Sequence, residues 1–238
     1  ALALNAGYIV GSDSGNITLV AGNGLSIGSG VFTITGAGDI FMDAGIGALL
    51  QSSTSTTAAG ENVRLVATGD VTVGEVIADK ISVLSSANIV TAPGASLNLS
   101  ASALRLDAGQ AIGTGTDPLT VSVSELSALA NTGGIFLSES DDITVSSVGV
   151  TTDKVGADAT TTPIADGALS DLQSGSNGSI VLSASGSITL DNGDSDGSVV
   201  AADGSGNILL DAAGALALNA GYIVGSGSGN ITLVAGNG

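Results

Sequence analysis

A short pattern of alternating apolar residues recurs along the whole chain. It has the form polar or small, apolar, any, apolar, any, small, and glycine usually follows. Clear instances are NITLVAG (16–22), DIFMDAG (39–45), NVRLVATG (62–69), ALRLDAG (103–109) and SIVLSASG (179–186). A period of two is typical of a β-strand with one buried face. Arg64 and Arg105 occupy in-between positions of this pattern, so we expect those positions to face away from the core.

Equivalent apolar positions return at intervals of twenty or so residues. Ile188 and Ile208 are 20 residues apart, and Ile208 and Ile231 are 23 apart. Leu97 and Leu119 are separated by 22 residues. A sandwich of hairpins would need tight two-residue turns, and the Asn-Gly signal for such turns is poor here. The spacing instead favours an all-β solenoid, a parallel β-helix in which each turn of the chain stacks short strands on those of the turn before.

The composition agrees with a long, narrow core. Aromatic residues make up 2% of the chain, whereas the hydrophobic fraction is 43% and there are 37 glycines. A compact globule would lack the bulky side chains that usually dominate a core. A column of stacked Leu, Ile, Val and Ala does not need them, and Gly and Asn suit its corners, where left-handed backbone conformations occur.

The charge balance excludes several partners. Asp and Glu number 22 against 4 Lys and Arg, a net charge of −18, whereas nucleic-acid binding needs clustered basic residues. The absence of cysteine excludes a disulfide scaffold and a thiolate metal site. No apolar run approaches the length of a membrane span, and no signal peptide is recognisable. We therefore expect no nucleic-acid partner and no membrane insertion of this segment, and any secretion signal should lie outside this fragment.

The chain repeats itself at long range. Residues 1–24 and 215–238 agree at 23 of 24 positions, and the one difference is Asp13 against Gly227. A β-helical coil tolerates many sequences, so near-identity of this kind indicates a duplicated unit. Residues 1–214 are predicted to be one long repeat unit, and residues 215–238 the first coil of the next. Such a unit would hold roughly ten coils and advance roughly 50 Å at about 4.8 Å per coil.

One region departs from the alternating pattern. Residues 150–179 alternate poorly, contain Pro163 and are rich in Asp, Thr, Ser and Gly. We expect a loop that protrudes from one coil. Long loops in regular solenoids often carry binding functions, although a tolerated surface insertion is the simpler interpretation.

The segments LDAGQAIGTGTDPLTV and GGIFLSESDDITVSSV, together with the recurring x-I-x-L-x-A-G segments, carry a family resemblance. They resemble the long tandem units of filamentous-haemagglutinin-like giant adhesins of Gram-negative bacteria. The resemblance implies a right-handed parallel β-helix, export to the bacterial cell surface, and a role in attachment or as a stalk. These motifs are structural, so they say little about a ligand.

A candidate calcium loop lies near the end of the unit. NGDSDGSVVAAD (192–203) matches the first six positions of D-x-[DN]-x-[DN]-G, with Asn192 in first place and Asp194 and Asp196 following. Asp203 stands at position twelve, where the shorter Asp replaces the usual Glu. The alternative is that Asp, Asn, Ser and Gly are simply the residues of turns.

Catalysis is not expected. Without His or Cys, acid–base chemistry would fall on acids such as Asp141 and Asp142, and the few aromatic rings offer little for a sugar-cleaving site. The sequence predicts a non-enzymatic structural repeat of a very long extracellular protein, with no required cofactor and Ca²⁺ as the one candidate ligand. Its partners would be identical units joined end to end, with lateral copies of the rod or cell-surface glycans as further candidates. The alternatives are a self-assembling filament or sheath subunit and a carbohydrate-binding or polysaccharide-cleaving β-helix.

Overall fold

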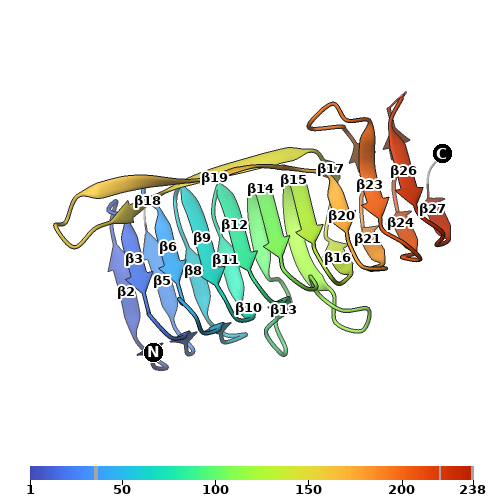
Figure 1. Cartoon of the computed structure of the whole chain (residues 1–238). Helices are drawn as coiled ribbons and strands as arrows, with labels where there is room; N and C mark the ends of the chain where they lie inside the picture. Colours follow the sequence, from blue (N-terminus) through green and yellow to red (C-terminus); the bar gives the residue numbers. More distant parts are fainter. Residues whose placement is uncertain (35–36, 220, 237–238) are drawn as a thin grey trace.

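The computed structural model describes residues 1–34, 37–219 and 221–236. Within these ranges the chain is all-β and contains no helix. Its strands stack side by side along an elongated body with the two termini at opposite ends (Figure 1). Nearly all pairings are parallel and join strands that lie one turn of the chain apart. This arrangement is compatible with a β-helix or solenoid.

In the first half of the chain each turn contributes three strands, and each strand pairs with the equivalent strand of the next turn. One five-stranded sheet consists of β1 (Leu2–Leu4), β4 (Leu25–Ile27), β7 (Leu49–Gln51), β10 (Val71–Val73) and β13 (Ile89–Thr91). A second ladder consists of β2 (Ile9–Ser12), β5 (Val31–Ile34), β8 (Thr56–Ala58) and β11 (Glu75–Ile77), and it continues where Val76 and Ile77 pair with Leu99 and Ser100. A third ladder consists of β3 (Ile17–Val20), β6 (Ile40–Asp43), β9 (Asn62–Ala67), β12 (Lys80–Ser85), β14 (Leu99–Ala108) and β15 (Leu119–Ala130).

In the second half the strands stack in a different grouping. The ladder of the five-stranded sheet continues through the bridge residue Ile112 to β16 (Ile135–Glu139), β21 (Ile180–Ala184), β24 (Ile208–Ala212) and β27 (Ile231–Ala235). Another consists of β17 (Ile143–Val145), β22 (Ile188–Leu190) and β25 (Leu216–Leu218). The last consists of β20 (Leu172–Ser174), β23 (Ser198–Ala202) and β26 (Ile223–Ser226). The long strand β15 pairs with β16, β17 and β20, so it is the junction between the two halves.

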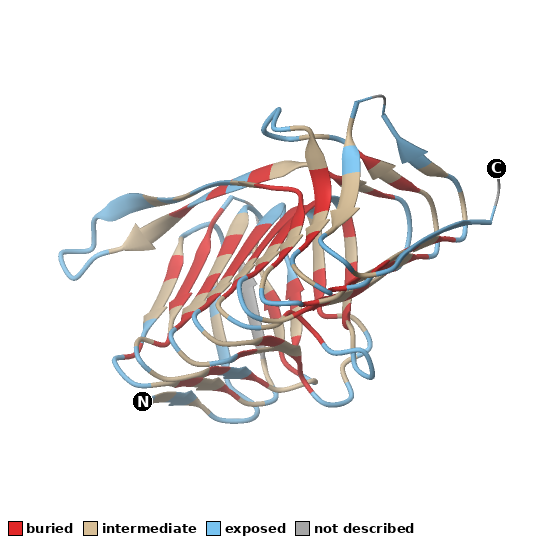
Figure 2. Cartoon of the chain, turned by 45° about the vertical axis from the view of Figure 1, so that its right-hand side comes forward, coloured by how far each residue is buried: buried red, intermediate tan, exposed pale blue. Residues whose placement is uncertain are grey.

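The core is a column of aliphatic side chains inside the stacked strands, and Figure 2 shows buried positions recurring along the ribbon from strand to strand. One continuous parallel ladder runs through Leu2, Leu25, Leu49, Val71, Ile89, Ile112, Ile135, Ile180, Ile208 and Ile231. Strands such as β9 and β21 alternate buried and partly buried positions, as the period of two predicts. Burial of each such aliphatic side chain is worth about 1.5–3 kcal/mol, so the column stabilises the stack along its whole length.

The pairing register corrects two details of the predicted spacing. Ile208 does pair with Ile231, but Ile188 pairs with Leu216 and not with Ile208. Each turn of the chain contains more than one strand, so two apolar residues 20 positions apart can lie in different ladders, as Ile188 and Ile208 do. The ladder from Leu2 to Ile231 takes nine steps, fewer than roughly ten coils per unit, because residues between β17 and β20 add no step.

Those residues form a hairpin and not a protruding loop. Strands β18 (Ser147–Val155) and β19 (Thr161–Ser170) pair antiparallel, so the hairpin begins three residues before the predicted segment 150–179 and takes up most of its first part. The hairpin runs across the outer face of the third ladder, contacting β3, β6, β9, β12, β14 and β15 (Figure 1). Its Val148 and Val150 form a small buried cluster with Ala103, outside the main core. A small apolar contact therefore helps to hold the start of the hairpin against the ladder.

Polar contacts fix β18 at positions far apart in the sequence. The backbone N–H of Val155 donates to Thr18 Oγ1 at 2.8 Å. The backbone N–H of Asp153 donates to Asp39 Oδ2 at 2.6 Å. The partners lie in or next to β3 and β6, so the hairpin spans the ladder from β15 almost to its N-terminal end.

Basic side chains hold β19. The guanidinium of Arg64 makes two 2.8 Å hydrogen bonds to the carboxylate of Asp166, and the two side chains are only 13% and 6% exposed. Arg64 and Lys154 both lie over the ring of Phe41. Arg105 donates from Nε to a backbone carbonyl of β19 at 3.1 Å. Both arginines thus face away from the core, as the alternation predicts, but the hairpin covers them.

Candidate functional site

The acidic loop 191–197 joins β22 to β23 and is built from side chains that bond to its own backbone. Asn192 Oδ1 accepts hydrogen bonds from the N–H groups of Asp194 and Ser195, at 3.2 and 2.8 Å. Asp194 Oδ1 accepts one from Asp196, and Asp196 Oδ1 accepts one from the residue that begins β23. Ser195 and Gly197 adopt positive φ angles of 69° and 91°. The spacing of Asn and Asp at every second position therefore produces a tight, locally satisfied turn.

The structure brings only part of the predicted metal loop together. Asp194 and Asp196 lie close to each other at the tip of the turn, and Asn192 supports the turn from inside. Asp203 lies elsewhere, just after β23, where its backbone N–H donates to the Ser174 carbonyl at 2.9 Å. The five residues of β23 lie between Asp196 and Asp203. An extended strand of this length spans about 16 Å and therefore carries Asp203 away from the loop. In a helical calcium-binding loop the same stretch of chain would be much shorter.

Asp171 takes the place that Asp203 was expected to fill. One carboxylate oxygen from each of Asp171, Asp194 and Asp196 lies within 4.8 Å of the others. Asp171 immediately precedes β20, where the chain rejoins the stack after the hairpin, and its φ is 69°. The sequence held no periodic signal for it, because Asp171 and Asp194 are 23 residues apart, whereas the strands that follow them pair 28 residues apart, Leu172 with Val200.

Asp171 is fully buried, and neither oxygen of its carboxylate accepts a hydrogen bond. Its backbone is well anchored, with the N–H donating to the Ser146 carbonyl at 3.0 Å and the carbonyl accepting from Ala128 at 2.9 Å. Burial raises the pKa of Asp171 to about 6; the backbone N–H of Gly193, which lies near the carboxylate but outside hydrogen-bond geometry, opposes the shift, and the nearby acidic loop adds to it. The main chain thus holds a carboxyl group in a buried site.

A second buried acid lies at the end of β16. Glu139 is 1% exposed, and Val121 and Ala184 are its partners on the two neighbouring strands. Its Oε1 accepts the N–H of Ser140 at 2.8 Å, and Oε2 accepts the N–H of Val123 at 3.1 Å. Burial raises the pKa of Glu139 to about 7, and the neighbouring Asp141 carboxyl adds to the rise, while the backbone donors oppose it.

The adjacent acids Asp141 and Asp142 support turns. Asp141 Oδ2 accepts the Ser122 hydroxyl at 3.3 Å, and Asp142 Oδ1 accepts the N–H of Ser187 at 2.6 Å. Each carboxylate therefore joins its own turn to a residue of a neighbouring turn of the chain.

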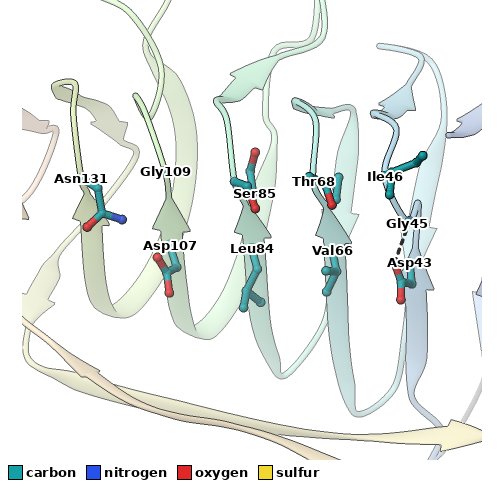
Figure 3. Close-up of a pocket in the computed structure, with 12 residues that line it drawn as sticks. Asp43, Gly45, Ile46, Val66, Thr68, Leu84, Ser85, Asp107, Gly109 and Asn131 are labelled. Atoms are coloured by element: carbon teal, nitrogen blue, oxygen red, sulfur yellow. Dashed lines mark hydrogen bonds between the residues drawn. The ribbon is translucent and has the colours of Figure 1, made fainter. Parts of the chain in front are cut away.

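A groove of about 610 Å³ lies at the carboxyl ends of β6, β9, β12 and β14 (Figure 3). Asp43, Val66, Leu84 and Asp107 stand side by side in it, one from each strand. Asp43 Oδ1 accepts the N–H of Gly45 at 2.8 Å, and Asp107 accepts a bond from Arg105 at 3.0 Å. None of the residues that line the groove has an aromatic ring, so the groove offers no surface on which a sugar could stack.

None of the protein-family models, curated proteins or solved structures compared with this chain gives a significant match. In the part of the chain that the structure describes, no helix has the length and apolar character needed to cross a bilayer.

Proposed function

We propose that this chain is a non-catalytic structural repeat of a very long extracellular protein, in which identical units join end to end into one continuous rod. The rod would serve for attachment or as a stalk on a bacterial surface. One observation carries this proposal. The first copy of the repeated segment pairs with the strands that follow it in the chain, and the second copy pairs with the strands that precede it.

The two copies form the same three strands. β1, β2 and β3 of the first copy pair with β4, β5 and β6, the strands that follow them. β25, β26 and β27 of the second copy pair with β22, β23 and β24, the strands that precede them. Residues 220, 237 and 238 of the second copy lie outside the described residues. One sequence thus makes both the forward and the backward contact, and in a tandem array each copy would make both.

Burial of equivalent residues supports this continuity. Ile17 pairs with Ile40 and is 7% exposed, whereas its counterpart Ile231 pairs with Ile208 and is 44% exposed. Leu233 at the same end is also largely exposed. Stacking of a further set of strands would remove this apolar surface from water, at about 25 cal/mol per Å². The one difference between the copies, Asp13 against Gly227, falls in an exposed turn, where Gly227 lies close to Gly204 of the preceding turn of the chain.

Within the proposal, the chain is a right-handed parallel β-helix. Connections between parallel strands of one sheet are right-handed in nearly all proteins, because a twisted strand returns to its sheet most easily in that sense. Residues 1–214 are the repeat unit, and 215–238 begin the next. The charge of −18 would keep neighbouring rods apart in solution, as expected of a long exposed filament. Export and the resemblance to filamentous-haemagglutinin-like adhesins belong to the same proposal.

The register adds that successive units would be rotated about the rod axis. The ladder that begins at Leu2 ends at Ile231. Ile231 is the copy of Ile17, whereas the copy of Leu2 is Leu216, which pairs with Ile188 in another ladder. The face that carries the hairpin in this unit would therefore be a different face in the next.

Scattering from one-unit and two-unit chains tests the proposal. A chain extended by a second 214-residue unit should lengthen by about 40 Å, from eight to nine strand spacings of 4.7–4.9 Å, and should remain a single straight particle. Two particles joined by a flexible link would contradict a continuous rod.

A second candidate is a filament assembled from short separate chains, which would join through unpaired strand edges at their ends. Denaturing electrophoresis of native material distinguishes the two. The rod proposal expects a species far larger than this chain, whereas assembled subunits would give a band near 22.5 kDa.

A further inference from the structure

We propose that Asp171, Asp194 and Asp196 form a binding site for a divalent cation, and that the cation is Ca²⁺. The site lies where the chain returns from the hairpin to the stacked strands. Its existence does not depend on whether units join into a rod.

The buried carboxylate is the first argument. Asp171 is fully buried, and neither of its carboxylate oxygens has a hydrogen-bond partner. A buried polar group without a partner costs about 1–3 kcal/mol, and an ionised group costs more. Its oxygen lies within 4.8 Å of oxygens of Asp194 and Asp196. The unpartnered group therefore faces two further carboxylates, where a cation between them would satisfy all three.

The charge balance is the second argument. Three carboxylates converge, and the ion pairs found among the described residues join Arg64 to Asp166 and Arg105 to Asp107, none of them in this cluster. The cluster therefore holds like charges with no basic side chain paired to them. A divalent cation is the simplest group that can neutralise such a site.

The chemistry of the donors selects the ion. The side chains that converge offer oxygen alone, which favours hard cations such as Ca²⁺ and Mg²⁺ over transition metals. Ca²⁺ accepts six to eight oxygens in irregular geometry, and carbonyl groups and water can complete its shell, whereas Mg²⁺ demands a near-ideal octahedron. Asp194 and Asp196 lie in the loop before β23, and Asp171 lies before β20, one full turn of the chain earlier. This irregular arrangement suits Ca²⁺.

The site joins two consecutive turns of the chain. Asp171 precedes β20, and loop 191–197 precedes β23, the strand that pairs with β20. Gly193 packs directly against Ser147, the first residue of the hairpin. A bound cation would therefore tie the acidic loop to both ends of the hairpin and stiffen the stack where its spacing is irregular.

Calorimetry and thermal unfolding of the whole chain test the site, with CaCl₂ as the probe. We expect binding with a dissociation constant of about 10⁻⁴–10⁻³ M and a rise in the unfolding temperature with Ca²⁺. Asp171→Asn should weaken binding by at least tenfold, and Asp194→Asn likewise. Asp203→Asn is the matched control, because it removes the same charge from the same sequence motif but from outside the cluster, and it should change affinity less than twofold.

Three outcomes would overturn the proposal. The first is no binding heat and no change in unfolding temperature at about 10 mM Ca²⁺, well above the expected range. The second is equal loss from Asp203→Asn and Asp171→Asn, which would favour a linear loop. The third is Mg²⁺ binding as tightly as Ca²⁺, which would remove the calcium assignment.

A folding control keeps the Asp171 variant interpretable. Asn tolerates the positive φ at this position and removes the buried charge. In EDTA, Asp171→Asn should therefore unfold at the same temperature as the parent or higher, and it should lose the gain from Ca²⁺. An unfolding temperature in EDTA well below that of the parent would mean that the chain itself satisfies this carboxylate, which contradicts the site.

Discussion

Glu139 should make the stability of this protein fall as the pH rises from acid to neutral. Its side chain is 1% exposed and lies between strands β15 and β21 at an inward position of β16. Burial raises its pKa from the ordinary value of 4.5 to about 7. Between these two values the folded chain holds a proton that the unfolded chain has released, so ionisation favours unfolding.

The size of the effect follows from the shift. A rise from 4.5 to about 7, at 1.36 kcal/mol per pH unit, corresponds to about 3 kcal/mol. Folding carries no penalty from this group below the unfolded pKa, and the full penalty is present above the folded pKa. This is a large share of the roughly 5–15 kcal/mol that stabilises a typical domain.

Glu139→Gln removes the charge at every pH and keeps an oxygen that can accept the N–H groups of Val123 and Ser140. Urea unfolding followed by far-ultraviolet circular dichroism should be measured at pH 4.5 and at about pH 8. Relative to the parent, the variant should gain about 3 kcal/mol between the two conditions. Glu61→Gln, at an exposed position, is the charge-matched control and should gain little. A pH-independent difference between the Glu139 variant and the parent would refute the reasoning.

Three further predictions concern the hairpin and the core. Arg64→Met should weaken the free energy of hairpin docking by about 3–5 kcal/mol, because it leaves the buried Asp166 unpaired, and adding Asp166→Asn should recover most of the loss. Hydrogen exchange of the β18 and β19 amides measures both effects. Equal exchange rates in all variants would contradict the role of the ion pair. Leu104→Ala, at a fully buried position, should lower the free energy of unfolding by about 2–5 kcal/mol in denaturant titration, and a loss below about 1 kcal/mol would mean that the column is loosely packed. In a chain of several units, a tag at Asp158 in the hairpin turn should appear on different faces of the rod in successive units under the electron microscope; tags along one face would contradict the rotation.

Local pattern was enough to predict the strands. The alternation in segments such as residues 62–69 and 179–186 gives β9 and β21, with inward and outward faces in the predicted phase. The segment 123–130, which contains good helix formers, is part of the strand β15 because stacking against β14 overrides its local propensity. Parallel stacking followed from the repeated interval between apolar positions, since a strand buried inside a column must meet a similar strand one turn later.

Long-range packing decided what the pattern could not. Residues 150–179 alternate poorly because most of β19 is exposed and the hairpin buries little apolar surface of its own. Its contacts join residues that are far apart in the sequence, such as Asp166 with Arg64 at a separation of 102 positions and Val155 with Thr18 at a separation of 137. No property of the segment itself specifies those partners, so the sequence suggested a loop where the tertiary structure has a docked hairpin.

The acidic site divides in the same way. The sequence by itself determined the turn at Asn192, Asp194 and Asp196, because side chains two and three residues from a backbone N–H can bond to it without help from the rest of the fold. Only the tertiary structure decided the third acid. It carries Asp203 away on β23 and places Asp171 against the turn, because residues one full turn of the chain apart become neighbours only when the strands have stacked.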